Sequence, residues 1–218
     1  MLPRLKQFAR DRLDHLSLPA AAKAERRHDH EGLPGTDPGI DAVESASLAW
    51  LGAAQDLSAT HDGGAARDFS LVRGWAPSYP ETSGYIVPTL IDAGVRRGDP
   101  MLLDRAKRMA DWLVSIQFAE GGFQGGTVDA KPVVPVTFNT GQILMGLAAA
   151  RRQFGDAYEE PMHRAAGWLV DTMDPDGCWR RFPTPFAAPG EKAYETHVAW
   201  GLIEAARASE GTDRARKY

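Results

Sequence analysis

The chain has 218 residues, 43% of them hydrophobic and 25% charged, which is enough for one sizeable domain with a buried core. Its 25 Lys and Arg against 29 Asp and Glu give a formal net charge of −4, which argues against nucleic acid or a polybasic membrane contact as partner. The lone Cys178 cannot form an intrachain disulfide, and residues 2–16 contain no apolar run typical of a signal peptide or membrane span. The expected location is the cytoplasm.

Residues 1–40 are predicted to form an N-terminal helix, over 2–16, and a linker. Residues 19–41 are expected to be the least structured stretch, because Gly, Pro and Asp gather there. His28 and His30 lie beside carboxylates, a pattern that can bind a metal ion. No second histidine cluster is near in sequence, so a solvated link is the preferred interpretation, and neither a metal nor another cofactor is expected.

Residues 41–218 repeat one pattern. A Trp-Leu pair near the end of a helix leads to a glycine turn, a polar loop and a new helix that begins at Glu-Thr or Asn-Thr. The tryptophans of the three copies are 62 and 56 residues apart, and the Glu or Asn positions are 58 and 56 apart. The copies are marked by Trp50, Trp112 and Trp168, and by Glu81, Asn139 and Glu195. Such a period predicts stacked supersecondary units.

The helices of these units alternate in character. Amphipathic helices are predicted over 41–58, 101–117 and 160–173, and apolar ones over 83–97, 140–154 and 195–208. An outer ring around an inner ring requires this alternation, because only the outer helices show a face to water. We therefore predict an all-α fold, an (α/α) toroid, with the glycine turns and the Glu or Asn positions at one end. The three tryptophans are assigned to the core.

The predicted ring is incomplete. Six helical hairpins of this period need roughly 340 residues, whereas this chain holds about three and a half. We expect either a chain truncated at its C-terminus or a half-ring whose open face is covered by a second copy or another partner.

Four stretches resemble known families. The turns at 117–123 (QFAEGGF) and 173–179 (MDPDGCW) resemble the repeats of terpenoid cyclases and protein prenyltransferases. The stretches at 71–90 (LVRGWAPSYPETSGYIVPTL) and 138–147 (FNTGQILMGL) resemble toroid proteins of bacterial exopolysaccharide gene clusters. This second resemblance spans about 42–218 and implies kinship with six-hairpin glycosidases, lyases and sugar epimerases. The chain lacks the acidic cyclase motif and the zinc ligands of a prenyltransferase.

The candidate site is the common end of the inner helices. Two carboxylates across a cleft, here Glu81 and Glu195, are what glycoside hydrolysis requires. His197 or Tyr79 is the candidate proton donor. Aromatic and polar side chains of the same loops are candidates for binding a sugar, and arginines for clamping an acidic group. These are Arg73, Trp75, Tyr79, Tyr85, Phe123, Phe138, Asn139, Gln142, Trp179, Arg180, Arg181 and Tyr194.

Structural roles compete with these assignments. Ser78 and Glu81 match a capping box, and Asn139 is a favoured N-cap residue. A helix N-terminus also stabilises an ionised carboxylate, so the glutamates are expected to act as bases or nucleophiles. The aromatic residue of each turn is expected more often to be a wedge between repeats.

Three functions remain open from the sequence. The first is an enzyme that hydrolyses, eliminates or epimerises a saccharide unit in polysaccharide biosynthesis or turnover. The second is a non-catalytic binding or scaffold module. The third is a terpenoid-cyclase-like protein with an apolar cavity.

Overall fold

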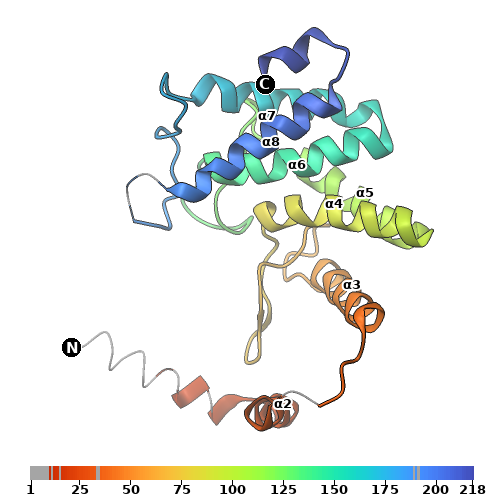
Figure 1. Ribbon diagram of the computed structural model, residues 1–218. Coiled ribbons are helices and arrows are strands. Elements are labelled where there is room, and N and C mark those ends of the chain that lie inside the picture. The colour runs from red at the N-terminus through yellow and green to blue at the C-terminus, as the bar shows by residue number, and fades with distance from the viewer. Residues whose placement is uncertain (1–9, 11, 15, 33–34, 189, 191) are drawn as a thin grey trace.

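The computed structural model describes residues 10, 12–14, 16–32, 35–188, 190 and 192–218. The helix expected over 2–16 falls largely outside them. The expectation that 19–41 is the least structured stretch is wrong for its first part, because helix α2 spans Ala20–Glu31. Its sequence, AAAKAERRHDHE, begins with alanines, the strongest helix formers, and Pro19 stands just before its first turn. Figure 1 shows α2 below the other helices.

Six further helices follow the predicted alternation closely. The outer ones are α3 (Ile40–Asp56), α5 (Pro100–Ser115) and α7 (Glu159–Thr172). The inner ones are α4 (Pro80–Arg97), α6 (Thr137–Phe154) and α8 (Thr196–Ala208). Short 3-10 helices occupy η1 (Asp156–Tyr158), η2 (Ala193–Glu195) and η3 (Asp213–Lys217). The only strands in the described residues are β1 (Phe69–Ser70) and β2 (Gly74–Trp75), an antiparallel hairpin.

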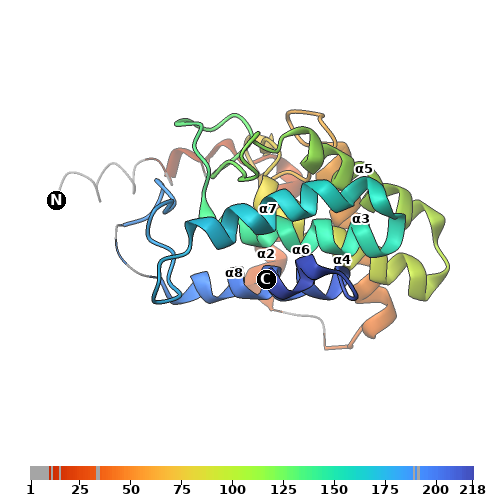
Figure 2. The same ribbon diagram turned by 90° about the horizontal axis from the view of Figure 1, so that it is seen from above.

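The inner helices form a layer in the order α4, α6, α8, with α6 packed between the other two. Figure 1 shows the three lying side by side with their N-terminal ends at the same side, and Figure 2 shows α5 and α7 covering the layer from above. The buried core runs along the seam between the two layers. It includes Leu90, Met109, Leu113, Leu144, Leu147, Met162 and Leu169.

Local sequence explains where these helices turn. Gly98 ends α4 in the left-handed conformation with φ 63°, which glycine adopts without a Cβ penalty. Asp99 then accepts a hydrogen bond from the backbone N–H of Met101, and Pro100 fills the first position of α5. A tight corner therefore joins an inner helix to the next outer one.

The first glycine turn locks onto the second unit. The side-chain amide of Gln55 donates to the carbonyl oxygens of Gly63 and Arg105, at 2.9 and 3.1 Å. The turn also lies flat against Trp112, because a Cβ at Gly64 would be 2.4 Å from its ring. Glycine is required here for this close approach. Trp112 is consequently only 6% exposed.

The second glycine turn repeats this contact with the third unit. Gln117 donates to the carbonyl oxygens of Gly121 and Pro161, at 3.0 and 2.9 Å. A Cβ at Gly122 would be 3.1 Å from the ring of Trp168, which is 7% exposed. Each of these two glycine turns therefore packs against the tryptophan of the following unit. The period in the sequence arises because the junctions between units are equivalent.

The first tryptophan departs from this pattern. Trp50 is 54% exposed, so its assignment to the core is wrong, while those of Trp112 and Trp168 are confirmed. Among the described residues no glycine turn precedes α3 to cover it. Its ring instead contacts Phe69 and Trp75, with centroids 6.0 and 4.8 Å away.

Candidate functional site

The predicted rim residues lie at the same end of the inner layer. Glu81 is the second residue of α4, Asn139 the third of α6, and Glu195 ends η2 directly before α8. Because the three inner helices run in the same direction (Figure 1), these positions share the N-terminal end of the layer.

Glu81 does not take part in a capping box. The hydroxyl of Ser78 bonds to Asp62 Oδ1 at 2.6 Å and to the Ser58 hydroxyl at 2.7 Å, so it is committed to the preceding loop. The carboxylate of Glu81 instead accepts a hydrogen bond from the Tyr79 hydroxyl, at 2.9 Å. The capping interpretation is wrong, and Glu81 and Tyr79 form a side-chain pair.

Burial sets the acidity of this pair. Removal of the Glu81 carboxylate from water raises its pKa, and the hydrogen bond from Tyr79 offsets only part of that rise. The helix N-terminus was expected to favour the ionised form of Glu81, but burial has the larger effect and in the opposite direction. Burial, with the nearby charge of Glu81, raises the pKa of Tyr79 to about 12. Burial therefore makes the Glu81 carboxyl a weaker acid than a carboxyl in water.

Asn139 lies beside Tyr79 but is not an N-cap. Helix α6 begins two residues earlier, with Val136 as N-cap, so Asn139 points inward from its first turn. Its side chain is 3% exposed, and its Nδ2 has no hydrogen-bond partner among the described residues. The side-chain amide of Asn139 is near the Tyr79 hydroxyl without meeting hydrogen-bond geometry, and it lowers the pKa of that phenol against the larger effect of burial. A buried donor without a partner calls for a ligand or water.

Gln142 lies one turn further along α6. It is fully buried, and neither atom of its side-chain amide has a hydrogen-bond partner among the described residues. Asn139 and Gln142 are three residues apart and so share a face of the helix. They supply unmet hydrogen-bonding capacity at the interior of the layer.

Two tyrosines extend the rim. Burial, with the charge of Glu81, raises the pKa of Tyr85 to about 12. Tyr194 stands edge-on to Phe138, with ring centroids 4.7 Å apart. Burial raises the pKa of Tyr194, and the charges of Glu195 and then Glu81 add to that rise. Tyr194 therefore lies within electrostatic range of both carboxylates.

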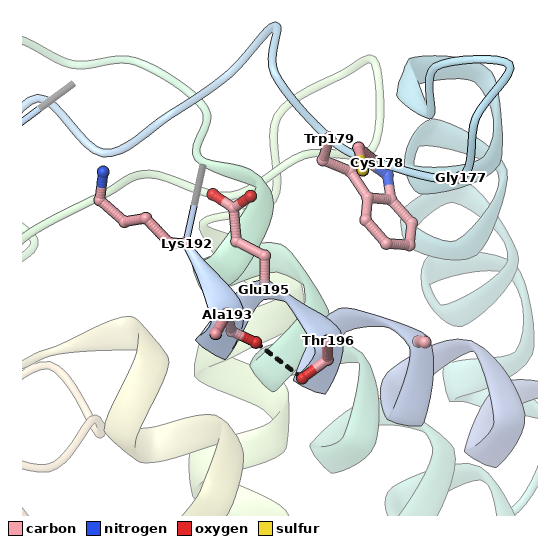
Figure 3. Close-up of a pocket in the computed structure, with 8 residues that line it drawn as sticks. Gly177, Cys178, Trp179, Lys192, Ala193, Glu195 and Thr196 are labelled. Atoms are coloured by element: carbon pink, nitrogen blue, oxygen red, sulfur yellow. Dashed lines mark hydrogen bonds between the residues drawn. The ribbon is translucent and has the colours of Figure 1, made fainter. Parts of the chain in front are cut away.

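Glu195 lines a cavity of about 390 Å³ at the start of α8. Figure 3 shows its carboxylate between Lys192 on one side and Trp179 with Cys178 on the other. Lys192 and Cys178, which also line this cavity, are not among the site residues predicted from the sequence. His197 is exposed and stands edge-on to Trp200 at 6.2 Å.

Three other candidates, Arg73, Trp75 and Phe123, are engaged elsewhere, and Trp179 is anchored to α7. Arg73 is exposed in the β1–β2 turn, and Trp75 packs on Trp50. Phe123 is fully buried in the core, as expected for a wedge between repeats. The Trp179 indole N–H donates to the Leu169 carbonyl at 2.8 Å.

The remaining arginines are held near the third turn. Arg180 bonds to Asp174 and Asp176, and that bond keeps the pKa of Asp176 at about 2. Arg181 donates to the carbonyl oxygens of Asp171 and Thr172. No group of acidic, histidine and cysteine side chains suited to a metal ion occurs in the described residues.

Comparison with known proteins supports the fold. The structure is similar to the crystal structure of a possible member of the GH105 family from Salmonella enterica serovar Paratyphi A, with a TM-score of 0.59 at 13% sequence identity. The match covers 76% of this chain and 50% of that one, so this chain spans about half the length of the solved structure. The predicted all-α toroid fold is thereby confirmed.

No family model matches the sequence, and no curated protein matches it either. In the described part of the chain, no helix is both long and apolar enough to cross a membrane.

Proposed function

We propose that this protein processes a glycan at the rim formed by the starts of α4, α6 and α8, with Glu81 as the proton carrier. The observation that carries the proposal is the partly buried Glu81 carboxyl paired with Tyr79, next to Asn139, whose Nδ2 has no hydrogen-bond partner among the described residues. A carboxyl whose pKa is raised by burial can give a proton to a leaving oxygen. Buried amides without partners suit the hydroxyl groups of a sugar. The fold shared with a glycosidase-family chain supports the same substrate class.

The proposal extends to polysaccharide biosynthesis or turnover, of the exopolysaccharide kind, in the cytoplasm. Its support is the resemblance of the stretches at 71–90 and 138–147 to proteins of such gene clusters. The proposed reaction is one of three: hydrolysis, elimination or epimerisation of a sugar unit. Each of the three gives a different product.

The test is to incubate the protein with a set of oligosaccharides and to follow their conversion by NMR. The spectra distinguish a new reducing end, an unsaturated product and an epimer. We expect Glu81→Gln to lower turnover by about 10²-fold or more, with circular dichroism and thermal unfolding showing an intact fold. Glu120→Gln, at an exposed position in a glycine turn, is the matched control and should leave turnover unchanged. Full activity in Glu81→Gln would remove Glu81 from the mechanism.

The second candidate is a binding module without chemistry. The observation in its favour is that the two glutamates have different surroundings. Glu81 pairs with Tyr79, whereas Glu195 lines a separate cavity with Lys192 and Trp179 at the start of α8. It predicts saturable oligosaccharide binding, measured by calorimetry, that persists in Glu81→Gln and is weakened in Asn139→Ala. A terpenoid-cyclase-like role is less well supported, because the buried side-chain amides of Asn139 and Gln142 have atoms without hydrogen-bond partners among the described residues, which an apolar ligand would leave unpaired.

A further inference from the structure

The carboxylate of Asp62, in the first glycine turn, is joined to the start of α4 through Ser78. Its Oδ1 accepts hydrogen bonds from the Ser78 hydroxyl at 2.6 Å and from the Gly64 backbone N–H at 3.1 Å. The Ser78 side chain is fully buried. A hydrogen bond to a carboxylate is stronger than one between neutral groups. Asp62 therefore ties the glycine turn to the residue directly before Tyr79.

The other polar groups of Ser78 are also held. Its backbone N–H donates to the Thr60 hydroxyl at 3.1 Å, and its hydroxyl lies 2.7 Å from that of Ser58. Its carbonyl oxygen accepts a hydrogen bond from the backbone N–H of Val128, in the second loop, at 2.9 Å. A buried polar residue whose groups all have partners is fixed in one position.

The main chain of Tyr79 is held by the same loop. Its N–H donates to the Ala65 carbonyl oxygen at 2.8 Å. Its carbonyl oxygen accepts from the Ser83 hydroxyl at 2.9 Å, and that hydroxyl accepts in turn from the Ala65 N–H at 3.0 Å. Ala65 and Ser83 are fully buried, so these bonds close a ring away from water. The place of the Tyr79 backbone is thus set by the loop that contains Asp62.

The second and third units lack this connection. The positions equivalent to Ser78 are 58 and a further 56 residues along the chain, at Val136 and Lys192, and neither has a hydroxyl. Asp176, the carboxylate of the third turn, accepts from a backbone N–H two residues on, as Asp62 does, but bonds to Arg180 instead of a rim loop. The link from turn to rim therefore does not follow from the repeat itself.

From these contacts we infer that Asp62 is a positioning residue of the proposed site, which acts through Ser78 to fix where the Tyr79 phenol meets the Glu81 carboxylate. The phenol donates to Glu81 at 2.9 Å. A shift of the Tyr79 backbone carries the phenol away from that carboxylate. The role in catalysis rests on the proposed function, whereas the positioning itself can be measured without any saccharide.

The experiment measures the pKa of Glu81 by NMR titration of side-chain carboxyl carbons in the full 218-residue chain. The signal of Glu81 is the one that Glu81→Gln lacks. Because the hydrogen bond from Tyr79 lowers the pKa of Glu81, Tyr79→Phe should raise it, and that rise defines the full effect. We expect Asp62→Ala to give at least half of the same rise.

The sign of the change separates positioning from a direct effect of charge. The loss of the Asp62 charge by itself would lower the pKa of Glu81, because a nearby like charge disfavours an ionised carboxylate. A fall in the pKa of Glu81 in Asp62→Ala, or no change, would therefore overturn the inference. Asp62→Asn keeps an oxygen acceptor for Ser78 and should show no rise. A full rise in Asp62→Asn would also contradict the proposed contact.

A double variant tests whether Asp62 acts through the phenol. In the chain that carries both Asp62→Ala and Tyr79→Phe, the pKa of Glu81 should equal that in Tyr79→Phe alone, because the group that Asp62 positions is absent. A further rise in the double variant would show a path that bypasses Tyr79 and would contradict the inference.

Two more variants complete the set. Asp176→Ala removes the equivalent hydrogen bond within the third turn and should leave the pKa of Glu81 unchanged. Ser78→Ala removes the other side of the contact and keeps the inference testable if Asp62→Ala does not fold. It should raise the pKa of Glu81 in the same way, and a folded Ser78→Ala chain with the wild-type pKa would overturn the inference.

Turnover separates this inference from the proposed function. If the chain converts no saccharide, the proposed function fails, while the pKa differences among the variants still decide whether Asp62 positions the pair. If the chain is active, the alkaline limb of the kcat profile should move to higher pH in Asp62→Ala, because it follows the pKa of the proton donor. A limb that stays in place while the pKa rises would contradict the role of Glu81 and not that of Asp62.

Discussion

Gly84 of α4 and Gly146 of α6 touch through their main chains, since a Cβ at residue 146 would lie 2.7 Å from the carbonyl oxygen of Gly84. Gly141 of α6 and Gly201 of α8 make the equivalent contact, where a Cβ at residue 201 would lie 2.4 Å from the Gly141 carbonyl oxygen. The inner helices are thus spaced by glycine rather than by side chains.

This spacing predicts the effect of Gly146→Ala. Overpacking against main chain costs about 1–3 kcal/mol, against a gain of about 1 kcal/mol from the better helix propensity of alanine. We expect net destabilisation in urea unfolding. Gly167→Ala, in α7 with no atom within 4 Å of its Cβ position, should instead stabilise the chain. Equal effects of the two variants would contradict the contact.

The second prediction concerns the junction amide of Gln55. Its side chain is buried and satisfies the carbonyl oxygens of Gly63 and Arg105. Gln55→Ala leaves both without their partner, and we expect a loss of about 2–3 kcal/mol in the free energy of unfolding. Gln153→Ala, at an exposed position near the end of α6, should change stability by less than about 0.5 kcal/mol.

The third prediction is a pH dependence from Glu81. Its pKa in the folded chain lies above the ordinary value of 4.5, so the folded state binds the proton more tightly than the unfolded state. Its contribution to stability is therefore present at acid pH and is lost as pH rises from 4.5 through the folded pKa. Glu81→Gln should remove this loss. Denaturant unfolding at several pH values should show the variant gaining on the wild type as pH increases, and a constant difference would contradict it.

A fourth prediction concerns the hydrogen bond between α5 and the 3-10 helix η1 that precedes α7. The buried Tyr158 donates a hydrogen bond to Asp111 Oδ1 at 2.5 Å, and Asp111 also pairs with Lys107. Because Asp111 is half exposed, water can replace the phenol. We expect Tyr158→Phe to cost about 1 kcal/mol. A double-mutant cycle with Asp111→Ala should show a coupling of similar size, and zero coupling would show that the bond contributes nothing.

The fold followed from the sequence because periodicity reports burial. The alternation of amphipathic and apolar helices gave their boundaries to within about three residues, apart from the N-terminal part. Helix α2 is not predicted because the Pro, Gly and Asp residues that follow it outweigh its alanines. Trp50 was misassigned because equivalence within a repeat was taken to mean equal burial, whereas an end unit lacks a neighbour.

The sequence predicts the arrangement of the candidate residues better than their contacts. The repeat predicted that Glu81, Asn139 and Glu195 share one end of the layer. It could not give the pairing of Glu81 with Tyr79, because the competing capping pattern used the same Ser78 and only three-dimensional contacts commit that hydroxyl to Asp62. The direction of the pKa shift of Glu81 depends on burial, which a pattern of local residues does not reveal.

The position of α6 between two like neighbours also sets the order in which the chain comes apart. In a repeat array, the free energy of unfolding comes largely from contacts between neighbouring units. A helix that packs against a neighbour on each side therefore unfolds only after the terminal units have separated. Amide protons of residues 143–150 should therefore exchange most slowly with solvent deuterium, and protection should decline outward toward α3 and η3.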